Sequence, residues 1–238
     1  MSEESFESVR LRAEQGDAEA QYNLGSMYEY GLGVPQDDKE AVRLYRLAAD
    51  QGDADAQNNL GYMYAYGRGV RKKYKEAVRW WRLAADQGDA VAQNALGYMY
   101  RNGLGVRKND KEAVLLYRLA ADQGDAVAQN ALGYMYRNGR GVRKNDKEAV
   151  RWWRAAADQG DADAQFTLGL SYDNGEGVPQ DYIQAHMWYN LSASNRTGDE
   201  RDIAVSNHDR VAEKMPPEDI SEAQRLASEW KPKGSGNQ

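Results

Sequence analysis

Small and apolar side chains recur every three or four residues along most of this chain, and residues at that spacing share one face of an α-helix. Ala20, Leu24 and Tyr28 follow one another at four-residue spacing, and a second apolar stripe runs from Ala41 to Ala49. A glycine-rich link, GLGV, lies between the two stripes. The pattern therefore predicts a pair of short amphipathic helices, each with one buried face.

The helix-pair pattern repeats along the chain. The glycine of a Gln-Gly step recurs every 36 residues, at positions 16, 52, 88, 124 and 160. A period between about 20 and 50 residues indicates an array in which each unit contacts only its neighbours. We therefore expect one elongated all-α domain. Its predicted parts are a capping helix at 1–16, five repeats at 17–196, capping helices at 197–231 and a disordered tail at 232–238.

Capping residues place the helix starts. An aspartate follows each of these glycines, and its carboxylate is suited to accept hydrogen bonds from the free amides of a first helical turn. The glycine suits the left-handed residue that ends the preceding helix, so the paired helices must fold back on each other. Asp37, Asn109, Asn145 and Asp181 cap the second helices. In the second repeat Lys73 occupies this position, and we expect its second helix to begin less firmly.

Glycines and aromatic residues in the helices predict close packing. A glycine recurs in the middle of each first helix, at positions 25, 61, 97, 133 and 169, at a cost of about 1 kcal/mol relative to alanine. A cost repeated five times indicates that helices cross there at short range. The second helices carry large aromatic side chains at helical spacing, and we assign Trp80, Trp81, Trp152 and Trp153 to the core.

The repeated pattern AxAQxxLGxMYxxGxGVxxxxxEAVxWWRxAADQGD resembles the Sel1-like repeat, a relative of the tetratricopeptide repeat, over residues 17 to about 193. The resemblance implies a right-handed α-solenoid of antiparallel helix pairs with terminal capping helices, in which the first helices line a concave groove. It also implies a scaffold for protein complexes. A cysteine-rich bacterial branch of the family is linked to penicillin binding, but this chain has no cysteine.

Charge is spread unevenly over the repeats. The chain has a net charge of −6, yet the second, third and fourth repeats carry +3, +1 and +3, and the first and fifth carry −4 each. Links between paired helices contain many of the cations, namely Arg71, Lys72, Lys73, Arg107, Lys108, Arg143 and Lys144. A basic centre attracts acidic partners or nucleic acid, although solvated helix faces produce the same pattern. The isoelectric point of about 5.1 makes nucleic acid the less favoured partner.

The sequence offers little for catalysis. The two histidines, His186 and His208, are well separated in the chain and match no metal-binding spacing. Ser228 and Lys231 form an SxxK pattern without the other β-lactamase motifs, which we interpret as coincidence. We therefore predict no catalytic residue, no metal site and no cofactor. No signal peptide or membrane segment is visible after Met1, so the cytoplasm is the expected location; a periplasmic or secreted protein that has lost its signal peptide would look the same.

Variable positions on the first helices are the better candidates for a functional site. By analogy with tetratricopeptide repeats, counting from the Leu-Gly pair, they face the groove. Asparagine amides can hold the backbone of an extended peptide, tyrosines offer flat apolar area with a polar tip, and arginines can pair with a carboxylate. The predicted groove residues are Asn58, Tyr62, Asn94, Tyr98, Arg101, Asn102, Asn130, Tyr134, Arg137 and Asn138.

These residues predict a non-enzymatic adaptor that binds a peptide or protein segment. An acidic segment is one option. A monomer is the favoured oligomeric state. The alternatives are a β-lactam binder or hydrolase like the cysteine-rich branch, and nucleic-acid binding through the basic links. A further possibility is that the asparagine and tyrosine ladders are only copies left by repeat duplication, because the third and fourth repeats are almost identical.

Overall fold

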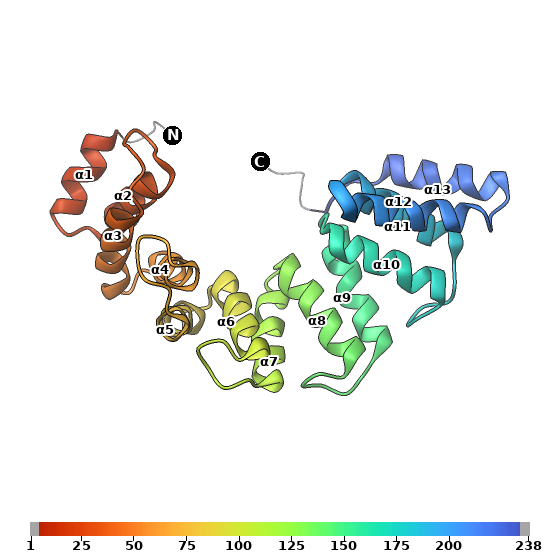
Figure 1. The fold of residues 1–238 in the computed structure, drawn as a ribbon, viewed down its shortest axis with the longest axis horizontal. Coiled ribbons are helices and arrows are strands. Elements are labelled where there is room, and N and C mark those ends of the chain that lie inside the picture. The colour runs from red at the N-terminus through yellow and green to blue at the C-terminus, as the bar shows by residue number, and fades with distance from the viewer. Residues whose placement is uncertain (1–4, 234–238) are drawn as a thin grey trace. The chain divides into compact units, whose positions relative to one another are not determined.

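A computed structural model describes residues 5–233, which form thirteen α-helices and no strand (Figure 1). The helices are α1 (Phe6–Glu14), α2 (Ala18–Tyr30), α3 (Asp38–Asp50), α4 (Ala54–Tyr66), α5 (Tyr74–Asp86), α6 (Ala90–Asn102), α7 (Asp110–Asp122), α8 (Ala126–Asn138), α9 (Asp146–Asp158), α10 (Ala162–Asn174), α11 (Tyr182–Ser194), α12 (Gly198–Ala212) and α13 (Pro217–Glu229). The chain divides into two compact units, Met1–Leu119 and Ala120–Gln238. The all-α fold of repeated helix pairs confirms the prediction from the apolar pattern.

The helix ends are built as the capping residues predicted. Asp17 and Asp125 accept hydrogen bonds from the amides of Ala20 and Ala128, at 2.7 and 2.6 Å. Gly16 has φ +94°, the left-handed conformation that lets the chain reverse between α1 and α2. Each unit therefore consists of helices that pack on their neighbours in sequence, α1 to α6 in the first and α8 to α11 in the second.

Helix α5 begins without a side-chain cap. Lys73 has the backbone of an N-cap residue, with φ −148° and ψ 96°, close to the −145° and 95° of Asp37, but its side chain makes no capping hydrogen bond. The helix still has the same 13 residues as α3 and α9. The missing cap therefore leaves the length of the helix unchanged, and its effect is expected in stability.

We expect Lys73→Asn to raise the free energy of unfolding by about 1 kcal/mol, because the new amide oxygen can accept from the first turn of α5. A urea titration followed by circular dichroism measures the change. Asn145→Lys is the matched control. Because Asn145 accepts from the Glu148 amide at 3.1 Å, this substitution should lower the free energy of unfolding by a similar amount. An unchanged unfolding midpoint for Lys73→Asn would show that the cap does not form.

The glycines inside the first helices lie directly against aromatic rings of the second helices. In the first unit, a Cβ added to Gly25 would be 2.9 Å from Tyr45, and one added to Gly61 would be 2.6 Å from Trp81 Nε1. Real Cβ atoms do not approach other atoms this closely, so only glycine lets the two helices cross here. The predicted close helix crossing is confirmed.

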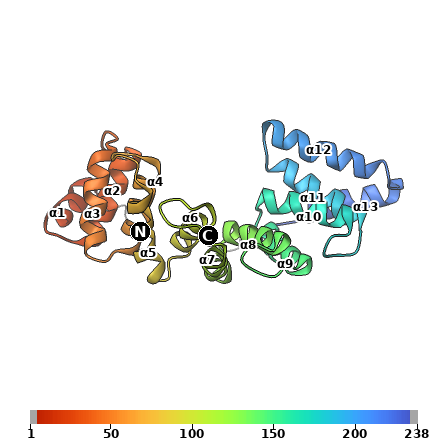
Figure 2. The same ribbon diagram turned by 60° about the horizontal axis from the view of Figure 1, so that its bottom comes forward.

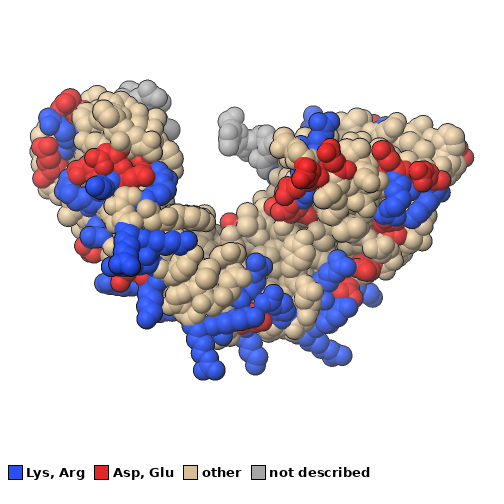
Figure 3. Space-filling model, viewed as in Figure 1, with Lys and Arg blue, Asp and Glu red and all other residues tan. Residues whose placement is uncertain are grey.

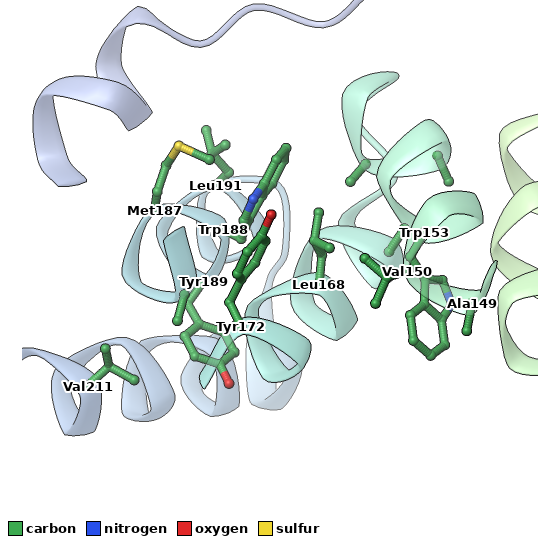
Figure 4. Close-up of a cluster of buried hydrophobic side chains, with 14 residues drawn as sticks. Ala149, Val150, Trp153, Leu168, Tyr172, Met187, Trp188, Tyr189, Leu191 and Val211 are labelled. Atoms are coloured by element: carbon green, nitrogen blue, oxygen red, sulfur yellow. The ribbon is translucent and has the colours of Figure 1, made fainter. Parts of the chain in front are cut away.

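The core of the second unit is also built around aromatic side chains of the second helices. Trp153 of α9 is 2 % exposed and packs in one cluster with Leu168 of α10 and Tyr189 of α11 (Figure 4). Val211 of α12 completes the cluster from the C-terminal side. The assignment of the second-helix tryptophans to the core is confirmed, since Trp80, Trp81, Trp152 and Trp153 are all 9 % exposed or less.

Buried glutamines tie successive repeats together, a feature that sequence reasoning missed. Gln57 donates from Nε2 to the Ala49 carbonyl at 3.1 Å, and so satisfies an acceptor at the end of α3. Ala49 belongs to the preceding repeat, whereas the amide oxygen of Gln57 accepts from Gln87 in the second helix of its own repeat at 2.9 Å. Gln129 and Gln159 repeat the contact in the second unit at 2.8 Å. The glutamine of the repeat is therefore a structural residue.

A buried carboxylate holds the first two repeats together. Glu29 is 7 % exposed; it accepts from the Tyr45 hydroxyl at 2.7 Å and from Arg68 Nη1 at 2.7 Å. Burial, and then the hydrogen bond to Glu29, raise the pKa of Tyr45, which therefore stays a neutral donor. Arg68 also pairs with Asp38 at 2.8 Å. This network crosses from one repeat to the next.

Helices α12 and α13 both pack against α11 (Figure 2). They lie where the sequence predicted two capping helices, with Pro217 in the first turn of α13. Trp230 contacts Trp188 edge-on, with ring centroids 6.4 Å apart. The predicted disordered tail, 232–238, falls mostly outside the described residues. The domain boundaries drawn from the sequence stay predictions.

Candidate binding surface

The predicted groove residues lie on α4 and α6 in the first unit and on α8 in the second. Some of them face away from the paired second helices, but several others contact those helices. The structure therefore separates side chains that are engaged within the fold from side chains that are open to a partner.

On α4 the two candidates differ in role. Asn58 accepts from Trp81 Nε1 at 3.1 Å, so its amide oxygen holds a core tryptophan in place. Tyr62 is 39 % exposed and lies edge-on to Trp81, at 5.4 Å between ring centroids. Its other side is stacked on Tyr66, at 5.9 Å and 10° between the planes. Tyr62 and Tyr66 thus present a joined aromatic surface supported by the core.

On α6 the candidates form a small aromatic and cationic group. Tyr98 is 49 % exposed, and the Arg101 guanidinium lies over its ring at 5.5 Å. Asn102 donates to the Tyr98 carbonyl at 2.8 Å, which closes the end of the helix. Asn94 is partly exposed. Among the described residues, Arg101 is paired with no carboxylate.

On α8 the equivalent side chains are bound within the second unit. Asn130 is 8 % exposed and donates to Asp161 at 3.3 Å. Arg137 forms an ion pair with Glu176 at 2.6 Å, and Tyr134 shares a hydrogen bond with the Thr167 hydroxyl at 3.0 Å. Asn138 repeats the helix-end contact of Asn102, donating to the Tyr134 carbonyl at 2.8 Å. This face is therefore largely satisfied by α10 and the link that follows it.

Exposed tyrosines that the candidate set left out extend the surface of the first unit. Tyr30 of α2 is 63 % exposed and Tyr66 of α4 is 68 % exposed. The two tyrosines stand at equivalent positions of successive repeats, so helical spacing alone could have found Tyr30. Together with Tyr62 and Tyr98 they place four partly exposed aromatic rings on the first helices of this unit. We call Tyr30, Tyr62, Tyr66, Tyr98 and Arg101 the tyrosine face.

Carboxylates gather at the opposite ends of the same helices. Asp55 lies in the first turn of α4, and its pKa is raised by burial first and then by the charges of Asp53 and Asp89. Asp53 and Asp89 cap α4 and α6. The first helices of this unit therefore carry negative charge at their N-terminal ends and the Arg101 cation at a C-terminal end.

The basic links form shallow hollows beside the second helices. Tyr100, Val106, Arg107 and Lys108 line one in the first unit. Tyr136, Val142, Arg143 and Lys144 line its counterpart in the second. Figure 3 shows Lys and Arg side chains gathered over the links of the first unit. These cations are exposed, and each hollow is open to solvent.

Potential metal ligands do not cluster in the part of the chain that the structure describes. No group of three or more potential ligands could hold a metal ion among them, and no described helix is both long and apolar enough to cross a membrane. The Ser228 hydroxyl donates to the Arg225 carbonyl at 2.8 Å. His186 and His208, although well separated in the chain, meet in space, with ring centroids 3.8 Å apart.

Repeated helix pairs, glycine-to-aromatic crossings and exposed first-helix faces define an α-helical repeat protein of the solenoid class. The family model for the Sel1 repeat matches residues 18–53, 54–89, 90–125, 126–161 and 162–196. The chain belongs to the Sel1 repeat family. Comparison with the curated proteins gave no match.

Two solved structures illustrate the likeness. One is a protective antigen of uropathogenic Escherichia coli strains that displays an SLR fold, 35 % identical with a TM-score of 0.88 over 94 % of this chain. The chain spans about half of that protein, 48 % of its length. The other is a Sel1 repeat protein from Oxalobacter formigenes, 36 % identical with a TM-score of 0.76, covering 91 % of this chain and 89 % of the other.

Proposed function

We propose that this chain is a non-enzymatic scaffold whose first-helix faces bind a peptide or protein segment, and that the tyrosine face of the first unit is the main contact. Sel1 repeat proteins are typically scaffolds for protein interactions. The observation that carries the proposal is the contrast between two equivalent arginines. Arg137 is held by Glu176 at 2.6 Å, whereas Arg101 lies over the Tyr98 ring with no carboxylate partner among the described residues.

The tyrosines suit a partner with apolar side chains. A tyrosine ring offers a large contact area with few rotatable bonds, so little entropy is lost when it is covered. Tyr62 is fixed between Trp81 and Tyr66, which lowers that loss further. Prolines or aliphatic side chains of an extended segment would pack on such rings.

The charges on this surface favour one orientation of a bound segment. Arg101 would meet a carboxylate, and Asp55 with its neighbours Asp53 and Asp89 would meet a cation. Tyr66 lies 11 positions beyond Asp55 on α4, which corresponds to about 16 Å of helix, or roughly five residues of extended peptide. A segment of that length with a basic end and an acidic end fits the surface.

We expect the remaining predicted residues to contribute less to partner binding. Asn94 and Asn102 flank Tyr98 on α6. The Asn58 side chain is engaged by the Trp81 indole. On α8, a partner must first break the existing hydrogen bonds and ion pair of Asn130, Tyr134, Arg137 and Asn138. The predicted monomeric state and cytoplasmic location stay predictions; light scattering after size exclusion and cell fractionation test them.

We expect Arg101→Gln to weaken capture of acidic peptides about 10-fold or more, because a hydrogen bond to a charged group contributes roughly 1.5–3 kcal/mol. The probe is an array of peptides of about ten residues, each with Asp or Glu near its carboxyl end and printed beside a copy with Asn or Gln there. Wild type should prefer the acidic copies, and Arg101→Gln should lose that preference.

Arg137→Gln is the matched control, because it changes the equivalent residue of an almost identical repeat. It should retain the preference for acidic peptides. Tyr98→Ala should weaken capture of both acidic and amide copies, since it removes apolar area and the support under Arg101. Equal capture of all peptides by wild type and Arg101→Gln would rule out the tyrosine face as the binding site.

A further inference from the structure

Two histidines meet at the interface between α11 and α12. His186 of α11 is 0 % exposed, and neither of its ring nitrogens has a hydrogen-bond partner among the described residues. His208 of α12 lies against it, with ring centroids 3.8 Å apart and planes at 43°. A buried polar group without a partner is costly, so the position calls for an explanation other than packing.

Helix α12 is held by two buried apolar side chains against α11 and by ion pairs to α10. Ala204 and Val211 are its buried residues, whereas Ile203 is 52 % exposed. The other anchor is Asp173 of α10, which is 2 % exposed and pairs with Arg210 and with Lys214 at 3.4 Å. Ionisable groups beneath α12 therefore contribute to its attachment alongside the apolar side chains.

The charges around the histidine pair come mainly from α12. His208 and Asp209 are the charged groups that act on His186, and Asp209 is within 2.8 Å of His208 Nδ1. From α10, Asp173 is already paired with Arg210 and Lys214. Helix α13 meets α11 through apolar side chains, with Trp230 against Trp188. No carboxylate among the described residues is bonded to the His186 ring.

We propose that His186 and His208 form a proton-sensitive latch, which holds α12 against α11 when both rings are neutral and releases it on acidification. A proton on the buried His186 ring meets no bonded anion in the closed state, because His208 lies against the ring and neither ring nitrogen has a partner among the described residues. Relief comes when α12 moves away and water reaches His186.

The sign of the effect follows from the pKa of His186. Burial first, and then the charge of His208, lower it from 6.5 to about 4, while Asp209 opposes the shift. The ring regains an ordinary pKa once α12 has opened. Between pH 6.5 and 4 the open state therefore binds a proton that the closed state does not, and opening is favoured as pH falls. From pH 7.5 to 5 the opening equilibrium should rise about 30-fold.

Hydrogen exchange followed by mass spectrometry on the full chain measures this opening. Amides of α12 should become about 30-fold less protected at pH 5.0 than at pH 7.5, after correction for the pH dependence of chemical exchange. Amides of α8 in the same unit should keep their protection. Carboxylates of ordinary pKa remain ionised above pH 5, so they do not contribute in this window.

His186→Phe keeps the ring volume and removes the proton site, and it should make the protection of α12 independent of pH. His208→Gln should leave only part of the pH dependence. An NMR titration of the wild-type His186 side chain gives an answer even where the variants do not fold. A His186 pKa near 6.5, or an α12 that opens equally in wild type and His186→Phe, overturns the proposal.

Discussion

Trp153→Ala is expected to remove about 3–5 kcal/mol from the free energy of unfolding, because truncating a buried large aromatic residue leaves a cavity that the surroundings fill only in part. The indole is 2 % exposed and lies in the cluster that joins α9, α10 and α11. Tyr134 packs edge-on against it at 5.4 Å.

A urea titration monitored by circular dichroism should show an earlier transition of the second unit for Trp153→Ala. Trp81→Ala should have a similar effect on the first unit, since Trp81 is 3 % exposed and occupies the equivalent position. Leu115→Ala is a suitable control because Leu115 is 54 % exposed and should change stability little. A shift in melting temperature of only a degree or two for Trp153→Ala would contradict the core assignment.

Gly133→Ala should destabilise the second unit by roughly 1–3 kcal/mol or more, although alanine is the better helix former. An added Cβ would lie 2.6 Å from Trp153 Cδ1. The ring is buried and cannot move away without disturbing the cluster around Leu168. The clash therefore outweighs the gain of about 1 kcal/mol in helix propensity.

A double-mutant cycle separates the clash from every other effect of the alanine. In the Trp153→Ala background the ring is absent, so Gly133→Ala should become neutral or stabilising. The sign of the substitution thus reverses between the two backgrounds, and their difference measures the coupling. If Gly133→Ala costs the same in both, the glycine is needed for its backbone and not for its contact with Trp153.

The helix pairs, their caps and the close crossings could be predicted from the sequence because each depends on residues within one repeat. Asp17 caps its own helix, and Gly133 contacts the second helix of its own repeat. The candidate positions lie on the first helices α4, α6 and α8, and their role in binding stays a prediction. Their exposure could not be predicted, because Arg137 is paired by Glu176 and Asn130 is covered through Asp161, both from the following repeat.

The buried polar groups escaped sequence reasoning for a similar reason. Glu29 reads as an ordinary surface acid until Arg68 and Tyr45 are seen around it. His186 and His208 match no short motif, and only the packing of α12 on α11 brings their rings together.

The sequence by itself determined that this protein is an array of helix pairs, where each helix begins and ends, and which aromatic residues form its core. Those properties follow from local periodicity, capping chemistry and the absence of a Cβ at one position per repeat. Only the tertiary structure decided which copy of a repeated side chain is open to a partner, and which polar groups are buried together. Those properties depend on contacts with residues outside the repeat, whose identities differ from one repeat to the next.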